Sequence, residues 1–93
     1  MSIESQIKDL LVEYFEPMEM KLVNDSHKHR GHGNVPDSDN SHFSLTIVSQ
    51  AFVNKTRLQQ HQMVYGCLRD LMDNPIHALI IHSYTPEEYQ NQA

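Results

Sequence analysis

The chain has 93 residues and a mass of 10.8 kDa, which suffices for one small domain and excludes TIM barrels, full dinucleotide-binding folds and multidomain enzymes. Hydrophobic residues make up 39%, with three glycines and four prolines, which excludes collagen-like, low-complexity and fully disordered chains. Twelve acidic and seven basic residues give a net charge of -5, which by itself disfavours nucleic acid and anionic membranes as partners. The single cysteine, Cys67, excludes an internal disulfide, and no apolar run reaches the length of a membrane span. We therefore expect a cytoplasmic protein with no membrane partner.

The first half of the chain predicts one helix and two strands. Apolar residues recur at three- and four-residue steps over residues 2–15, which predicts an amphipathic helix that ends before Pro17. Apolar and polar residues alternate over 18–22 and again over 43–47, as is typical of half-buried strands. The stretch between these strands, residues 25–41, is polar and rich in histidine, and it is longer than an ordinary hairpin loop.

The second half predicts a helix, a strand and a last short helix. Residues 56–72 place five residues on one helical face, with Val64 and Leu71 beside it: Leu58, His61, Tyr65, Leu68 and Met72. Residues 77–84 form a short apolar segment typical of a buried strand, and 85–88 carry the capping signals of a short helix. A helical crossover makes the second and third strands parallel. We therefore predict a single α+β domain over 1–93, with a mixed three-stranded sheet covered by helices on one face.

Histidines in the long loop are the first candidates for chemistry. His27, His29 and His32 lie within six residues, so their imidazoles could chelate a divalent metal, although on the residues alone we favour a solvated loop over a ligand role. One cysteine is too few for a closed zinc finger. His77 and His82 are five residues apart on the third strand, which sends their side chains to opposite faces. Any metal role for His77 therefore requires a ligand from another segment.

The remaining reactive residues point to structural roles, and no enzyme motif is present. We interpret His82 as a structural residue, His61 as a hydrogen-bonded core histidine and Cys67 as a buried, inert thiol. The sequence has no Gly-x-Ser-x-Gly turn, no phosphate-binding glycine loop and no paired carboxylates in its apolar pattern. We therefore expect no catalytic residues and a protein that is not an enzyme.

Several strings resemble the BolA family, over residues 3–89. They are Asn24-Asp25-Ser26, Ser41-His42-Phe43, Ile76-His77-Ala78-Leu79 and His82-Ser83-Tyr84-Thr85. The resemblance implies a fold related to the type II KH domain. It also implies a non-enzymatic partner of monothiol glutaredoxins that shares a 2Fe–2S cluster for iron sensing or cluster delivery. In such a complex the glutaredoxin cysteine and glutathione hold one iron, and the BolA-like protein holds the other.

The same resemblance implies the ligands in this chain. The family ligand that precedes the third strand corresponds to His77. Its companion comes from the loop and corresponds to His29, with His32 as the rival because this loop carries a few extra residues. Imidazole ligands raise the potential of a cluster and leave a proton-sensitive bond, which suits transfer or sensing better than storage.

Two other functions remain open. Some family members are transcription regulators, but the family's Arg-His-Arg is Gln60-His61-Gln62 here, which leaves Lys55, Arg57 and Arg69 as weak candidates for DNA contacts. The histidine loop could instead buffer zinc, nickel or copper without a glutaredoxin.

The net charge is +3 over 26–69 and -4 over both 1–25 and 70–93, so the middle of the chain could face glutathione or an acidic protein surface. A homodimer also remains possible.

Overall fold

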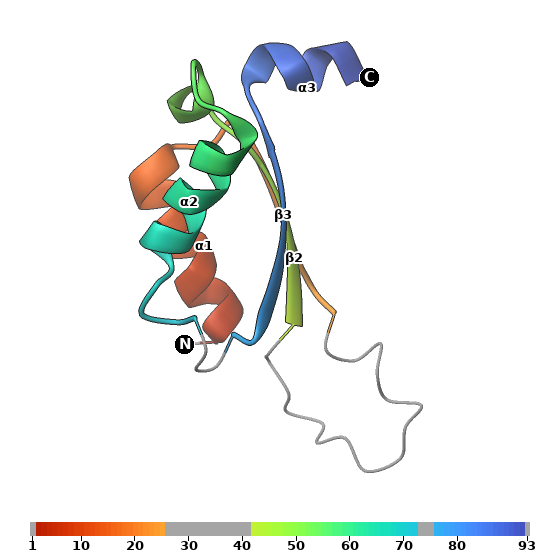
Figure 1. The fold of residues 1–93 in the computed structure, drawn as a ribbon. Helices are drawn as coiled ribbons and strands as arrows, with labels where there is room; N and C mark the ends of the chain where they lie inside the picture. Colours follow the sequence, from red (N-terminus) through yellow and green to blue (C-terminus); the bar gives the residue numbers. More distant parts are fainter. Residues whose placement is uncertain (1, 26–41, 73–75, 93) are drawn as a thin grey trace.

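The structure is a computed structural model that describes residues 2–25, 42–72 and 76–92 (Figure 1). Its elements are α1 (Ile3–Phe15), β1 (Glu19–Asn24), β2 (His42–Val48), the short 3-10 helix η2 (Gln50–Phe52), α2 (Arg57–Cys67), β3 (Ala78–Tyr84) and α3 (Pro86–Gln92). The predicted α+β class and the order of helices and strands are confirmed, with η2 as an addition that the sequence pattern missed. No helix in the described part of the chain is both long and apolar enough to cross a bilayer.

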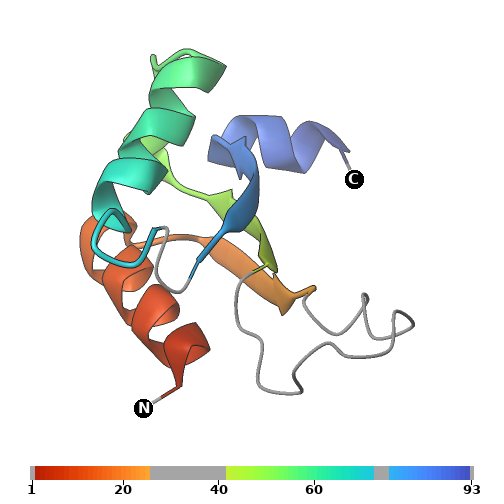
Figure 2. The ribbon, with the colours of Figure 1, turned by 60° about the horizontal axis from the view of Figure 1, so that its bottom comes forward.

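The three strands form one mixed sheet with β2 in the centre. β1 pairs antiparallel with β2, from Glu19 opposite Val48 to Asn24 opposite Phe43. β3 pairs parallel with β2, because α2 carries the chain back to the end of the sheet where β2 begins. Figures 1 and 2 show α1 and α2 side by side on one face of the sheet, with α3 apart from them at the end of β3. The predicted layering is therefore confirmed.

A single apolar core lies between the sheet and the two long helices. Alternate residues of β2 are buried, as expected for a strand with one face against helices. The core residues are Ile7, Leu11, Phe15, Phe43, Leu45, Ile47, Phe52, Val64, Leu68, Ile76, Leu79 and Ile81. Each such side chain contributes roughly 1.5–3 kcal/mol relative to full exposure. The rings of Phe15 and Phe52, 5.2 Å apart between centroids, join the end of α1 to η2.

Both ends of α1 have local causes. Ser2 caps the helix by accepting a hydrogen bond from the Ser5 backbone N–H at 3.1 Å. Pro17 disfavours helical backbone in the residue before it. Glu16 leaves the right-handed helical region in a left-handed C-cap conformation with φ 44°, and its N–H still donates to the Val12 carbonyl at 3.0 Å. The helix therefore ends where the sequence predicted.

The second helix is shorter than predicted. It ends at Cys67 instead of residue 72, and residues 68–71 form a turn. In this turn the Leu68 carbonyl accepts from the N–H groups of both Leu71 and Met72, at 2.8 and 3.1 Å. The chain then forms a single bridge between Met72 and Ile76 on its way to β3. Apolar residues continue past the end of the helix because the turn also packs on the core.

The predicted apolar face of α2 is wrong at two positions. Leu58 is 67% exposed and Tyr65 is 38% exposed, whereas Gln60, which was not expected on this face, is buried next to the expected Val64. Gln60 is buried because its side-chain amide forms hydrogen bonds with groups outside the helix. A hydropathy pattern assigns glutamine to the surface and therefore places the helix in the wrong rotation.

Candidate functional site

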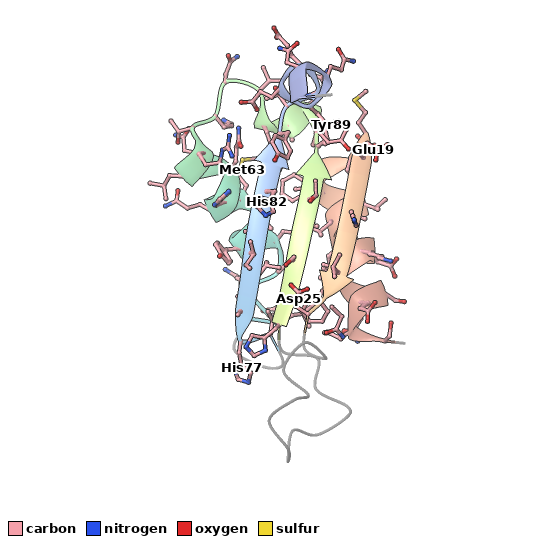
Figure 3. The ribbon with its side chains drawn as sticks, turned by 90° about the vertical axis from the view of Figure 1, so that its right-hand side faces the viewer. Glu19, Asp25, Met63, His77, His82 and Tyr89 are labelled. Atoms are coloured by element: carbon pink, nitrogen blue, oxygen red, sulfur yellow. The ribbon has the colours of Figure 1, made fainter. Side chains whose placement is uncertain are left out.

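His77 lies immediately before β3, at the end of the sheet where β1 ends and β2 begins (Figure 3). Its side chain is exposed. The next residue, Ala78, is the register partner of His42 on β2, and the His42 carbonyl accepts from the Asp25 N–H at 2.8 Å. The described residues on either side of the long loop, Asp25 and His42, therefore lie at the same end of the sheet as His77.

Hydrogen bonds hold this end of the sheet in place. The Ser44 hydroxyl on β2 donates to the Asp25 carboxylate. The Asn24 side-chain amide donates to Glu4 of α1 at 3.4 Å, which ties the end of β1 to the helix layer. Since backbone pairing and side-chain bonds both act here, the points where the chain leaves and re-enters the sheet are fixed relative to β3.

The predicted loop ligands cannot be placed beside His77. His29 and His32, like His27, lie outside the described residues, so their assignment stays a prediction. Within the described part of the chain, no three His, Cys, Asp or Glu side chains are grouped closely enough to hold a metal ion. An exposed imidazole can ligate iron, as in clusters where histidine replaces cysteine. His77 therefore fits the role of one ligand, and the described residues do not complete a three-ligand group around it.

Cys67 is an unsuitable ligand in this fold. It lies on α2, half-buried, with its Sγ 3.5 Å from the Leu10 carbonyl of α1. Burial raises the pKa of the thiol, and the nearby Glu13 carboxylate raises it further. A thiol with a raised pKa carries little thiolate at neutral pH, which is the form that binds metal. The interpretation of Cys67 as an unreactive thiol agrees with these contacts.

His61 and His82 approach each other from α2 and β3. Burial, the Arg57 guanidinium and His82 all lower the pKa of His61, in that order of size. Its Nε2 is buried and has no hydrogen-bond partner among the described residues, so the predicted hydrogen-bonded core histidine is wrong in that detail. His82 is exposed, so its predicted structural role finds no support in burial. All three effects favour the neutral imidazole of His61 over its charged form.

The basic candidates for DNA contacts are exposed but widely separated. Lys55 and Arg57 flank the start of α2, whose first turn has no acidic residue, and the Arg57 guanidinium lies 5.9 Å from the Tyr84 ring centroid. Arg69 follows the other end of α2, and 11 helical residues span about 17 Å. Gln60 is 3% exposed, so a basic residue there would not face solvent in this fold. Of the two positions where the resemblance implies an arginine, Gln60 and Gln62, only Gln62 is exposed.

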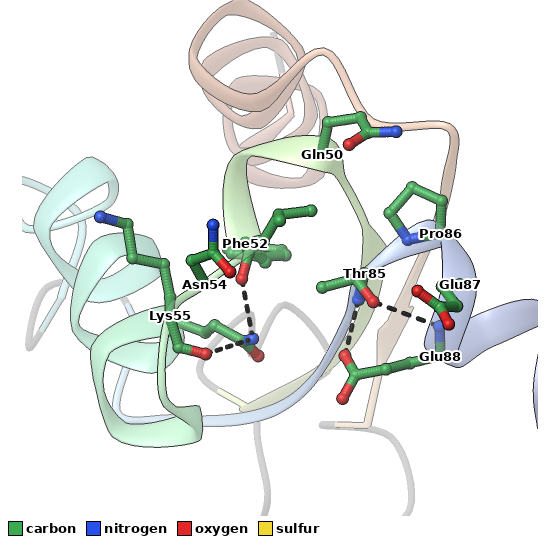
Figure 4. Close-up of a pocket in the computed structure, with 10 residues that line it drawn as sticks. Gln50, Phe52, Asn54, Lys55, Thr85, Pro86, Glu87 and Glu88 are labelled. Carbon is green, nitrogen blue, oxygen red and sulfur yellow. Dashed lines mark hydrogen bonds between the residues drawn. The ribbon is translucent and has the colours of Figure 1, made fainter.

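A polar pocket of about 500 Å³ lies between the η2–α2 connection and the start of α3 (Figure 4). Lys55 lines one side, and Glu87 and Glu88 line the other. The Glu88 carboxylate accepts from the Thr85 N–H at 2.8 Å, and the Thr85 hydroxyl accepts from the Glu88 N–H at 3.2 Å, which closes a capping box. The sequence showed this cap but not the pocket, because the facing wall comes from a distant part of the chain, between Gln50 and Gln60. The two carboxylates make the pocket unsuitable for phosphate.

Comparison with known proteins matches the model of the family described as BolA-like protein over residues 11–88. The DNA-binding transcriptional regulator BolA of Vibrio cholerae is 39% identical over 95% of this chain and 79% of that protein. The regulator of the same name from Escherichia coli is 33% identical over 97% of this chain and 82% of that protein. Among solved structures, BolA1 from Arabidopsis thaliana superposes with a TM-score of 0.85 at 33% identity, covering 95% of this chain and 96% of that one.

Proposed function

Because the chain belongs to the BolA family, we propose that it is a non-enzymatic partner of a monothiol glutaredoxin and shares a 2Fe–2S cluster with it for iron sensing or cluster delivery. The observation that carries this proposal is the position of His77. It is exposed beside the two ends of the histidine-rich loop, Asp25 and His42. One exposed imidazole beside the described ends of a histidine-rich segment suits a cluster that two proteins hold together. A cytoplasmic location is part of the same proposal.

The ligand chemistry of this chain limits what it can do alone. His77 and a loop histidine, His29 with His32 as the rival, would hold one iron through neutral imidazoles. The thiolates for the other iron would come from the glutaredoxin cysteine and glutathione, since Cys67 is packed against Leu10 with a raised pKa. The cluster would supply iron or an electron-accepting centre. Because imidazole binds metal only when deprotonated, this half of the site would release the cluster as the pH falls.

Reconstitution tests the proposal. The purified chain is mixed with a monothiol glutaredoxin, glutathione, iron and sulfide, and visible absorption and circular dichroism are recorded. We expect the His77→Ala variant to lose the spectrum of the mixed complex. His82→Ala is the matched control, because His82 is also an exposed histidine of the β3 segment. Separate His29→Ala and His32→Ala variants identify the loop ligand. If His77→Ala and the parent chain give the same spectrum, the ligand assignment is wrong.

DNA-binding regulation is the second candidate, and the names of the Vibrio cholerae and Escherichia coli relatives favour it. The exposed Lys55 and Arg57, at a helix start without acidic residues, could contact phosphates. A relation to type II KH domains belongs to this proposal too and rests on the order of the elements. Binding of a labelled duplex should be measured at several salt concentrations. Arg57→Gln should reduce the salt slope by about 1. Affinity that vanishes at moderate salt in the parent chain would remove this candidate.

A further inference from the structure

An apolar groove separates the end of α1 from the last turns of α2. It has a volume of about 310 Å³ and is lined by Tyr14, Phe15, Ala51, Met63, Gly66 and Cys67. Phe15 is almost fully buried and forms part of the core, whereas Tyr14 is 66% exposed. The exposed Tyr14 side chain therefore adds apolar surface at the α1 edge of the groove.

Gly66 lines this groove from inside a helix, where the rest of the fold gives no reason for a glycine. Glycine costs about 1 kcal/mol relative to alanine within a helix. A Cβ built at Gly66 would have no other atom within 4 Å, so neighbouring side chains do not require its absence. The backbone has no unusual φ there. The missing side chain instead leaves the groove open beside Met63 and Cys67.

The segment of α1 and its C-cap that contributes Tyr14 and Phe15 to the groove is acidic. Residues 9–19 contain four acidic residues and no basic one. α1 has no basic residue in its last turn, so the negative end of its dipole adds to these carboxylates. Glu13 is close enough to Cys67 to influence the thiol electrostatically. Neither Glu13 nor Glu16 forms an ion pair within the described ranges, which leaves their charge available to an occupant.

We propose that this groove docks a basic segment of a partner protein, with one large apolar side chain seated beside Gly66 and flanking Lys or Arg residues facing Glu13 and Glu16. The volume is at the lower end of the roughly 300–1,000 Å³ that small-molecule sites span, so one anchoring side chain fits it better than a larger ligand. An apolar anchor surrounded by complementary charge is a common arrangement in protein recognition. The groove lies between the helices, whereas His77 precedes β3, so this inference is independent of the cluster proposal.

Three matched peptides test it. The first is an eight-residue peptide with Leu-Phe at its centre and lysines and serines on both sides. The second replaces the lysines with glutamates, and the third replaces Leu-Phe with Ser-Ser. Binding to the full chain is followed by amide chemical shifts in ¹⁵N NMR spectra. We expect the first peptide alone to shift the amides of Ala51, Met63, Gly66 and Cys67. Equal shifts with the glutamate peptide, or no shifts with any peptide, would overturn the proposal.

Variants separate docking from folding. Gly66→Leu should fill the groove and lower the affinity for the first peptide by about tenfold or more. Its fold should be retained, because the added side chain enters open space. Gly66→Ala is the matched control and should bind within a few-fold of the parent. A Glu13→Gln/Glu16→Gln double variant leaves the groove open and should lower the affinity for the same peptide several-fold. Unchanged binding by Gly66→Leu, or a dimer of the parent chain that Gly66→Leu dissociates, would refute a basic partner segment as the occupant.

Discussion

Replacement of the buried Gln60 is the sharpest test of how α2 is held on the sheet. Its side-chain Nε2 donates to the carbonyls of Phe52 at 3.2 Å and Lys55 at 3.1 Å. Its Oε1 accepts from the hydroxyl of Ser83 at 2.7 Å, and Ser83 is fully buried on β3. One amide therefore connects η2, the start of α2 and β3. Gln60→Leu removes all three hydrogen bonds and leaves most of the volume filled.

The expected loss of stability depends on which hydrogen bonds each partner of Gln60 keeps in the variant. The Phe52 carbonyl still accepts from the Lys55 N–H at 3.1 Å, and Lys55 is at the surface, so these two carbonyls together account for about 1 kcal/mol. The Ser83 hydroxyl loses its acceptor in a buried position, which costs about 1–3 kcal/mol. We expect Gln60→Leu to lower the free energy of unfolding by about 2–4 kcal/mol, out of the roughly 5–15 kcal/mol typical of small domains.

Urea unfolding followed by far-UV circular dichroism measures this loss. Gln62→Leu is the matched control on the exposed side of the same helix, and it should change stability by less than about 0.5 kcal/mol. A Gln60→Leu/Ser83→Ala double variant removes both buried partners and should be at least about 1 kcal/mol more stable than the sum of the single losses predicts. A loss below about 1 kcal/mol for Gln60→Leu, or strict additivity in the double variant, would refute the reasoning.

Three further predictions follow from the caps and the titrating groups. The Thr56 hydroxyl accepts from the Gln59 N–H at 3.1 Å as part of a capping box, which Thr56→Ala removes. We expect this variant to lower the free energy of unfolding in urea by about 1 kcal/mol. An unchanged unfolding midpoint would show that the cap is dispensable. The pKa of His61 should lie below its ordinary value of 6.5 when NMR follows its ring protons. Because the folded state disfavours its charged form, its contribution to stability is present above pH 6.5 and is lost as the pH falls through the folded pKa. His61→Gln should flatten that part of the stability profile, and a pKa above 6.5 would contradict the assigned burial. Glu13→Gln removes a charge that raises the pKa of Cys67 and should speed labelling of that thiol by a disulfide reagent at pH 7, whereas slower labelling would show the opposite electrostatic sign.

Periodicity and caps predicted most of the fold because the forces that form those elements are local. Alternation identified β2, and the proline rule placed the end of α1 next to Glu16. The rotation of α2 depends instead on contacts that Gln60 makes with Ser83, 23 positions later. The Tyr65 hydroxyl similarly donates to the Leu79 carbonyl at 3.1 Å, which holds that ring at the edge of β3 and outside the core. No window along one helix contains these partners.

For the candidate site too, the sequence predicted features that depend on local spacing and missed those that depend on distant contacts. The odd spacing of His77 and His82 predicted that any companion ligand of His77 must come from another segment, and the ligand role of His77 stays a prediction. The pattern did not show that His61 and His82 approach each other, because their proximity arises from the packing of α2 against β3. The groove beside Gly66 escaped notice too, since an isolated glycine in a helical pattern becomes informative only when its surroundings are known to be empty.

The central position of β2 affects how harmful substitutions in this protein would be interpreted. Both strand pairings, and hence the placement of His77 beside the ends of the loop, depend on residues 42–48. A genetic screen for lost activity would therefore recover many substitutions in β2, such as at Leu45 or Ile47, that act by lowering the amount of folded protein. Substitutions at the exposed His77 would leave protein abundance unchanged. Measuring abundance together with phenotype would thus distinguish residues that maintain the scaffold from residues that carry its function.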